Sequence, residues 1–126
     1  VAKQVPYPVK LVWSREEEVR HGSFRPQSSA GLKASLKDGK ITALQIDYAQ
    51  SGNAEGEVPF IYNIPATSRR HFAYQSNQID GPWRSVNATQ LGFYTESFMD
   101  ELALAAGADP YQFRRKHLAE GSRHLK

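Results

Sequence analysis

The chain has 126 residues, of which 40% are hydrophobic and 11% aromatic, enough for one globular domain with a modest core. It contains no cysteine, which excludes disulfides, thiolate metal sites and a cysteine nucleophile. The net charge is +3, and the excess lies in the segment 107–126, where five residues are basic and two are acidic.

The sequence lacks the features that direct a chain to a membrane. No apolar run reaches the roughly 18 residues of a transmembrane helix, so we expect no membrane insertion. The first ten residues show no signal peptide. Because the chain begins with Val1 rather than methionine, we expect residues 1–126 to be a single domain from a longer polypeptide. The compartment stays open between the bacterial cytoplasm and the periplasm.

The first predicted element is a buried strand at Pro8–Arg15, a short run rich in valine, leucine and tryptophan. Ser14 then predicts the start of a short helix, because its hydroxyl can cap the first turn and Glu17 can complete a capping box. The acidic triplet Glu16–Glu18 is interpreted as the solvated start of this helix. Three consecutive carboxylates diverge around a helix, so a metal site is the weaker interpretation.

The clearest pattern in the sequence is a β-hairpin between Leu32 and Tyr48. Apolar and polar residues alternate on both sides of Lys37–Lys40, whose Asp-Gly pair supplies the positive φ of a tight turn. On the returning strand the alternation changes phase after Ile41. This change predicts a β-bulge near Ala43.

Three segments follow the hairpin. Ser51–Glu57 is a loop by composition. The segment 58–65, VPFIYNIP, predicts an irregular apolar crossing, because its two prolines do not suit a central strand. Ser68–Asn77 alternates well enough to predict another strand.

Two helices are predicted at the C-terminal end. The first is amphipathic and ends at Gly107. Its apolar face is predicted at Leu91, Tyr94, Thr95, Phe98, Leu102 and Ala105. The second begins with Asp109 as N-cap and Pro110 in the first helical position, and should run to about Glu120 and stop at Gly121. The order of elements predicts an α+β fold, with a hairpin-containing sheet followed by two C-terminal helices.

Familiar catalytic motifs are missing from the sequence. It contains no GxSxG, Walker or GxGxxG motif. The histidines lack metal-ligand spacing, and we interpret them as surface or edge residues: His21, His71, His117 and His124. We therefore assign no catalytic and no metal-binding residue. The basic run Arg114–His117 fans around a helix without interleaved aromatic residues, which argues against nucleic-acid binding.

The loop GPWRSV, Gly81–Val86, stands immediately before the first of these helices. A loop entering a helix exposes free backbone N–H groups, and Arg84 adds a positive charge, so an anionic or oxo-bearing ligand would suit this place. The alternative makes Trp83 a hydrophobic anchor and Arg84 a surface ion-pair partner. By physical chemistry alone, the alternative is favoured.

Two long segments carry a family resemblance. PVKLVWSREEEVRHGSFRPQSSAGLKASLKDGKITAL and GPWRSVNATQLGFYTESFMDELALAAGADPYQFRRKHL resemble consecutive parts of the molybdopterin-binding large subunit of the molybdenum hydroxylases, the xanthine oxidase family. The most similar branch contains isoquinoline 1-oxidoreductase and the bacterial aldehyde dehydrogenases. The resemblance covers nearly the whole chain and keeps several motifs in order. It implies one domain of a larger molybdenum-binding subunit.

The resemblance implies four cofactor-binding residues. Trp83 and Arg84 match the family's aromatic–arginine loop beside the molybdenum centre, and Ser85 follows them in that loop. Gln90 matches a glutamine that closes the loop. Purine-oxidising members continue this loop with glycines and a second aromatic residue, whereas this chain continues with Ser85, Val86 and Asn87. A different heterocycle or an aldehyde is therefore the expected substrate.

The implied activity is hydroxylation of an aldehyde carbon, or of a carbon beside nitrogen in an aromatic ring, with oxygen from water. Electrons would leave through iron–sulfur clusters on another subunit or domain. The family's catalytic glutamate lies in a GxGE-type segment that this chain lacks, and Glu55, in AEGE, lies in the wrong part of the order to take its role. The main pterin-binding segments are expected outside the chain too.

This segment alone is therefore expected to be inactive and to hold no molybdenum–molybdopterin tightly. Its expected partners are the remainder of the large subunit and an iron–sulfur subunit or domain, and its exposed surfaces could lead to self-association. One alternative is a non-catalytic interaction module of the same fold. Nucleic-acid binding through the basic tail is the less favoured alternative.

Overall fold

The structure is a computed structural model that describes residues 2–52 and 60–125. Its elements are η1 (Ala2–Gln4), α1 (Arg15–His21), β1 (Ser28–Lys37), β2 (Lys40–Ser51), β3 (Ala66–Tyr74), α2 (Ala88–Ala105), α3 (Pro110–His117) and η2 (Arg123–Leu125). Within the described part of the chain, no helix is long and apolar enough to cross a membrane.

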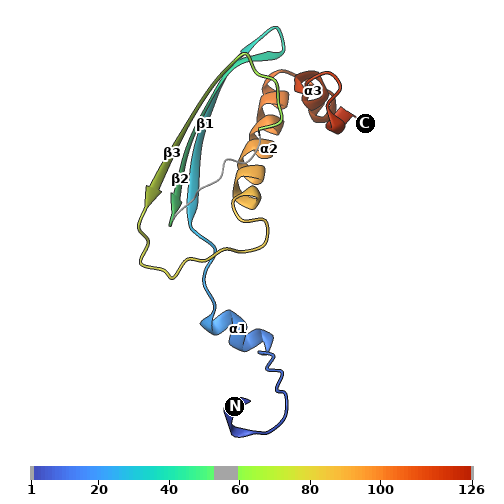
Figure 1. The fold of residues 1–126 in the computed structure, drawn as a ribbon. Coiled ribbons are helices and arrows are strands. Elements are labelled where there is room, and N and C mark those ends of the chain that lie inside the picture. Colours follow the sequence, from blue (N-terminus) through green and yellow to red (C-terminus); the bar gives the residue numbers. More distant parts are fainter. Residues whose placement is uncertain (1, 53–59, 126) are drawn as a thin grey trace.

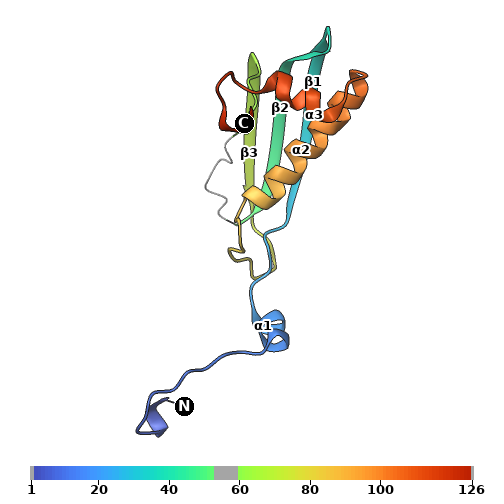
Figure 2. The same ribbon diagram turned by 90° about the vertical axis from the view of Figure 1, so that its right-hand side faces the viewer.

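The three strands form one mixed sheet in the order β1-β2-β3. β1 pairs with β2 antiparallel, and β2 pairs with β3 parallel. Helix α2 covers one face of the sheet, and α3 follows it at the hairpin end (Figure 1). Seen from the helix side, α2 runs obliquely across the strands (Figure 2). The predicted α+β fold, a sheet followed by two helices, is confirmed.

The hairpin turn and the bulge lie where the sequence predicts them. Asp38 and Gly39 both have positive φ, 52° and 66°. Ser35 pairs with Ala43, but the next residue of β1 pairs with Ile41, so one residue of β2 is left over at the bulge. The bulge allows both Ile41 and Leu44 to face the core, although they are three positions apart.

The core lies between the inner face of β2 and the helices. Its buried members are Ile41, Leu44, Ile46, Tyr62, Ile64, Met99, Leu102, Ala103 and Phe113. Tyr62 and Ile64 confirm the predicted apolar crossing for its described residues, 60–65. The predicted loop Ser51–Glu57 lies outside the described residues beyond Gly52, and Ser51 itself belongs to β2.

The apolar face of α2 differs in part from the prediction. Leu102 is buried as expected, but Ala105 is exposed, and Met99 and Ala103 are buried instead. The prediction counted apolar residues along one stripe, whereas α3 packs on α2 from the side. Met99 and Ala103 share the buried cluster with Phe113 of α3.

His117 is buried, so the prediction of a surface or edge position is wrong for this histidine. Its Nε2 accepts a hydrogen bond from the backbone N–H of Ile41 at 3.0 Å, and its Nδ1 lies 2.7 Å from the carbonyl oxygen of Phe113. A neutral ring with its proton on Nδ1 satisfies both contacts. The imidazole therefore joins α3 to the hairpin beside the bulge. The other three histidines are exposed, as predicted.

Helix α3 begins as predicted and ends earlier. The Asp109 side chain accepts a hydrogen bond from the Gln112 N–H at 2.9 Å, and Pro110 opens the helix. The predicted end at about Glu120 is wrong, because the helix ends at His117. There the backbone turns extended and forms an antiparallel bridge between Leu118 and Tyr62. A tertiary backbone contact thus replaces the last helical turn.

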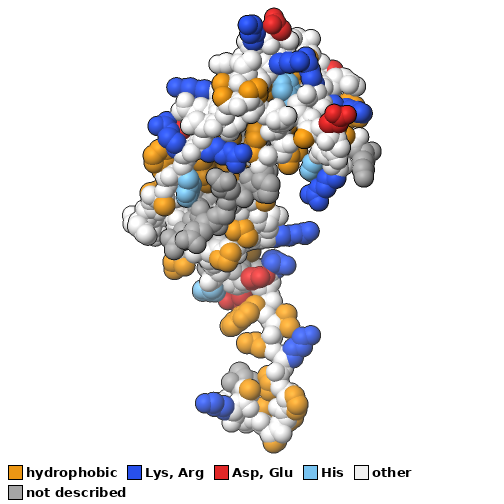
Figure 3. Space-filling view, turned by 45° about the horizontal axis from the view of Figure 1, so that its top comes forward, with side chains coloured by type: hydrophobic (Ala, Val, Ile, Leu, Met, Phe, Trp, Pro, Cys, Tyr) orange, Lys and Arg blue, Asp and Glu red, His pale blue; other side chains and the backbone are white. Residues whose placement is uncertain are grey.

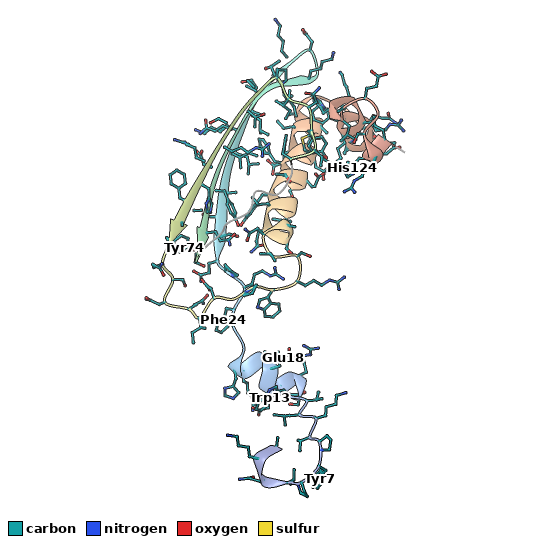
Figure 4. All side chains as sticks on the ribbon, in the orientation of Figure 1. Tyr7, Trp13, Glu18, Phe24, Tyr74 and His124 are labelled. Atoms are coloured by element: carbon teal, nitrogen blue, oxygen red, sulfur yellow. The ribbon has the colours of Figure 1, made fainter. Side chains whose placement is uncertain are left out.

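The predicted buried strand at Pro8–Arg15 is wrong. Residues 8–14 are extended and exposed, and Arg15 already begins α1. The helix cap is confirmed, because Ser14 Oγ accepts a hydrogen bond from the Glu17 N–H at 3.3 Å. Apolar side chains are exposed along this segment (Figure 3), which lies apart from the sheet and carries Trp13 (Figure 4). An apolar run predicts burial, but the surface that would bury it is not among the described residues.

A polar network joins α2, α3 and the crossing segment. The Tyr62 hydroxyl donates to Glu96 Oε2 at 2.8 Å, and Arg114 Nε donates to the same oxygen at 2.9 Å. Arg114 also donates to Asp100 Oδ1 at 2.6 Å. Burial raises the pKa of Tyr62, and its bond to Glu96 adds to the effect, so the phenol stays protonated. The basic run of α3 is therefore largely used in internal contacts.

We expect His117→Phe to lower the free energy of unfolding by about 1–3 kcal/mol, because it keeps a ring but leaves the Ile41 N–H buried without an acceptor. Urea unfolding measures the difference. His124→Phe is the control, since His124 is exposed in η2 and its replacement should change stability by less than about 0.5 kcal/mol. Equal effects of both substitutions would contradict the assigned hydrogen bond.

Stability should fall in acid. The Arg114 guanidinium holds the pKa of the Asp100 carboxyl below its ordinary range, and Arg70 does the same for Asp47. Because these pKa values are lower in the folded than in the unfolded chain, the stabilisation is present above about pH 4 and is lost as the pH falls through the folded-state values. Urea unfolding between about pH 6 and pH 2 should show a shallower loss for D47N/D100N than for the parent protein. Parallel pH profiles would contradict this.

Candidate functional site

The loop at Gly81–Asn87 lies below the sheet and leads into α2. Its first residues are paired with the segment that precedes β1. The Gly81 N–H donates to the Phe24 carbonyl at 2.9 Å, and the Phe24 N–H donates to the Ile79 carbonyl at 2.9 Å. Phe24 is labelled at this junction in Figure 4. The entry to the loop therefore has a fixed path.

Gly81 is required by close approach rather than by its φ. A Cβ at this position would lie 2.0 Å from Ser23 Oγ and 2.5 Å from Ser23 Cβ. Only a residue without a side chain allows the two backbones to lie so close. Pro82 follows in the chain, and its ring fixes its φ angle, which restricts the path of the backbone into Trp83.

Trp83 is anchored by its indole. Its Nε1–H donates to the Ser23 carbonyl at 2.9 Å, and the guanidinium of Arg25 lies 5.5 Å from the ring centroid, within cation–π distance. The ring is about half exposed, at 49%. Trp83 thus combines an anchored edge with a face that is open to solvent or to another group.

The residues after Arg84 adopt a strained turn. Ser85 and Val86 have φ values of 71° and 44°, in the left-handed region that costs a residue other than glycine roughly 1–2 kcal/mol. The Val86 N–H donates to the Trp83 carbonyl at 2.9 Å, and the Ala88 N–H donates to the Ser85 carbonyl at 2.8 Å. A β-branched residue rarely takes this conformation, and strain of this kind concentrates at functional sites.

Arg84 sits at the apex of this turn and is exposed. Its carbonyl is 3.5 Å from Thr89 Oγ1. Within residues 2–52 and 60–125, its guanidinium forms no hydrogen bond and no ion pair. The alternative in which Arg84 is a surface ion-pair partner has no support among these residues. The charge is available to a group from outside.

Gln90 lies in the first turn of α2 with its amide enclosed. Both its Nε2 and its Oε1 are shielded from solvent and have no hydrogen-bond partner among the described residues, and the same holds for Arg25 Nη1 and Asp80 Oδ1. Nearly all buried polar atoms in folded proteins are paired. These atoms therefore fit an additional polar group, either a ligand or further polypeptide, beside the loop. An oxygen-rich, anionic cofactor matches the donors of Arg84, Arg25 and Gln90.

A second, buried link holds the end of the loop to the sheet. The side-chain Nε2 of Gln50 donates to Asn87 Oδ1 at 3.0 Å, and the Tyr48 hydroxyl donates to Gln50 Oε1. Gln50 is 2% exposed and Asn87 is 7% exposed. Asn87 precedes α2 with helical backbone angles, φ −76° and ψ −17°, and its side chain makes no cap bond. The side chain bonds to Gln50 instead.

The described residues contain no group of three or more histidine, aspartate or glutamate side chains placed to hold a metal ion. A shallow groove crosses all three strands near Lys33, Gln45 and Ser68, closer to the hairpin end than to the loop. It contains no cluster of titratable groups comparable with those around Gly81–Asn87. The loop is therefore the best-supported candidate site in the described part of the chain.

The comparison with protein families identifies the class of this chain. The family model for the molybdopterin cofactor-binding domain matches residues 1–118, which include the loop, α2 and α3. The chain belongs to this family.

Individual relatives agree with this assignment. One of the subunits of nicotinate dehydrogenase from Pseudomonas putida is 30% identical over 95% of this chain, and the beta chain of isoquinoline 1-oxidoreductase from Brevundimonas diminuta is 27% identical over 94%. The solved structure of aldehyde oxidoreductase from Desulfovibrio gigas superimposes on 78% of the chain with a TM-score of 0.67 and 26% identity. The chain spans 12%, 18% and 12% of the lengths of these three proteins.

The structure brings three of the four predicted site residues together in one loop, Trp83, Arg84 and Ser85, and places Gln90 in the helical turn that follows. Their binding of a cofactor stays a prediction. Sequence reasoning missed Arg25, Gln50 and Asn87. One signal was available for Gln50, because it occupies an inward position in the alternation of β2, where a polar residue needs a partner. No local pattern links Arg25 to Trp83, which is 58 positions away.

Replacing glycine by alanine should have opposite effects at two positions. Gly81→Ala should destabilise the protein by about 1–3 kcal/mol, because the added methyl overlaps the Ser23 side chain and forces the two segments apart. Gly92→Ala is the matched control, since it meets open space inside α2 and should stabilise by about 1 kcal/mol. Urea unfolding compares the two variants. A neutral Gly81→Ala would show that the loop entry is not closely packed.

Proposed function

We propose that this chain is part of the large subunit of a molybdenum-dependent oxidoreductase, in which Gly81–Asn87 forms one wall of the cofactor site. The family match over residues 1–118 carries the proposal, because it extends through the loop and through the helix that the loop enters. The substrate class is an aldehyde or an N-heterocyclic aromatic compound. The names of the relatives support this class, since they act on nicotinate, isoquinoline and aldehydes.

Four residues of this chain would hold the cofactor: Trp83, Arg84, Ser85 and Gln90. Arg84 contributes a permanent positive charge that has no partner among the described residues, and the Gln90 amide contributes a donor and an acceptor that are enclosed and unpaired there. The bound molybdenum–molybdopterin supplies the two-electron oxidation of the substrate carbon, to which an oxygen atom from water is added. The Trp83 ring, which is about half exposed, would cover one side of this space.

The catalytic glutamate and most of the pterin-binding backbone would come from further polypeptide. The extended N-terminal segment supports this arrangement, because Leu11, Val12 and Trp13 are 64–73% exposed. Apolar side chains so far from any core are typical of a surface that packs against another one. The remainder of the large subunit would cover them, and an iron–sulfur subunit or domain would accept the electrons. Without these partners, we expect the same segment to cause self-association.

The test is Arg84→Ala in the full-length subunit. We expect a loss of about tenfold or more in aldehyde or N-heterocycle oxidation per subunit, with reduced molybdenum content, because hydrogen bonds from a charged group contribute roughly 1.5–3 kcal/mol. Metal analysis and steady-state kinetics measure the two quantities. Arg123→Ala, at an exposed arginine of η2, is the control and should leave both unchanged. If Arg84→Ala also leaves both unchanged, the loop does not belong to the site.

A further inference from the structure

The strained turn of the loop needs a restraint that holds it in place. Ser85 and Val86 are not glycines, yet both have left-handed φ values. Such a conformation persists only when the surrounding structure holds it in place. The two turn hydrogen bonds, from Val86 to Trp83 and from Ala88 to Ser85, are local and move with the loop. The restraint must therefore come from contacts that join the loop to the rest of the fold.

Among the described residues, two hydrogen bonds make such contacts directly beside the turn, one on each side of it. On the entry side, the Trp83 indole donates to the Ser23 carbonyl at 2.9 Å. On the exit side, Asn87 accepts the hydrogen bond from Gln50 at 3.0 Å. Arg84, Ser85 and Val86 are the only residues between these two anchors. A short segment with both ends fixed has few conformations available, which limits how its strain can relax.

The exit anchor is the stronger restraint, because it is buried. Trp83 is half exposed, so water competes for its bond, whereas Gln50 and Asn87 are nearly inaccessible. Gln50 is itself held from behind by the Tyr48 hydroxyl. Tyr48 in turn stacks on His71 of β3, with ring centroids 5.5 Å apart, and contacts Tyr94 of α2 edge to face at 6.2 Å. Through Tyr48 and Gln50, the packing of β3 and α2 therefore helps to fix the position of Asn87.

The chemistry of Asn87 points the same way. An asparagine at the N-cap of a helix normally uses its side-chain oxygen to accept a hydrogen bond from the first turn. Here the oxygen accepts from Gln50, and the side chain makes no cap bond. Asn87 has helical backbone angles, φ −76° and ψ −17°, rather than the extended ones of a capping residue, so its side chain is free to connect the loop to the sheet.

We propose that Gln50 and Asn87 are positioning residues: their buried amide pair holds Ser85 and Val86 in the left-handed conformation and thereby sets the position of Arg84. The mechanical part of this proposal depends only on the fold. The consequence for cofactor binding rests on the proposed function of the loop.

The experiment uses Gln50→Met in the full-length subunit, because methionine keeps the volume but removes the donor and the acceptor. Gln45→Met is the matched control on the same strand. Gln45 points to the opposite face of the sheet, where its side chain donates to Asp47 at 2.8 Å. Hydrogen exchange of the peptide 83–91, read by mass spectrometry, reports on the Val86 and Ala88 amides. Asn87→Ala is measured alongside, because it removes the same bond from the loop side.

We expect these amides to exchange on the order of tenfold faster in Gln50→Met and in Asn87→Ala than in the parent protein, and unchanged in Gln45→Met. Equal exchange in Gln50→Met and Gln45→Met would overturn the proposal. Val86→Gly, added to Gln50→Met, should recover part of the protection at Ala88, because glycine takes the left-handed conformation without strain. A general loss of packing would not be recovered by that change, so no recovery would also overturn the proposal.

Molybdenum content separates the two proposals. Faster exchange together with a loss of molybdenum in Gln50→Met supports both the positioning role and the cofactor role of the loop. Faster exchange with full molybdenum content keeps the positioning role of the amide pair and contradicts the proposed function of Arg84. The hydrogen-exchange result therefore decides the positioning role without reference to the activity of the enzyme.

Discussion

The packing of α2 on one face of the sheet is the contact on which the rest of the structure depends. Met99, Leu102 and Ala103 of α2 share one buried cluster with three inward residues of β2, and apolar side chains of β1 pack against it. The N-terminal end of the same helix carries the loop, and the Gln50–Asn87 pair fixes that end to the same strand. The packing of one helix on the sheet thus bears on both the core and the place of the candidate site.

The motifs that carry the family resemblance have a structural explanation in this chain. Glu96 and Asp100 of α2 both bond to Arg114 of α3, and the neighbouring Phe113 is buried in the core. A charged network of this kind fixes the angle between two helices, because each bond requires a particular direction of the guanidinium plane. These residues fix how α3 packs on α2. The loop before α2 instead carries a polar group that has no partner among the described residues.

The proposed site is incomplete within the described residues of this chain. Arg84, Gln90 and Arg25 each present polar atoms without a partner among the described residues, and the N-terminal segment presents apolar ones. The enclosed atoms of Gln90 and Arg25 are unfavourable because they have lost their hydration, and the N-terminal segment is unfavourable because its apolar area stays exposed to water. The small share of the relatives' lengths that the chain spans agrees with this picture. A site assembled from several segments needs such surfaces on each of them.

The sequence by itself determined the elements whose signals are local: the Asp-Gly turn and bulge of the hairpin, the Ser14 and Asp109 caps, and the order of strands and helices. Each depends on residues a few positions apart, so a pattern can reveal it. Only the tertiary structure decided the burial of His117, the early end of α3, the exposure of Pro8–Arg15 and the anchoring of the loop by Ser23 and Gln50. Those outcomes depend on hydrogen bonds and apolar contacts between residues that are distant in the chain, and no local pattern encodes which distant partner a side chain will meet.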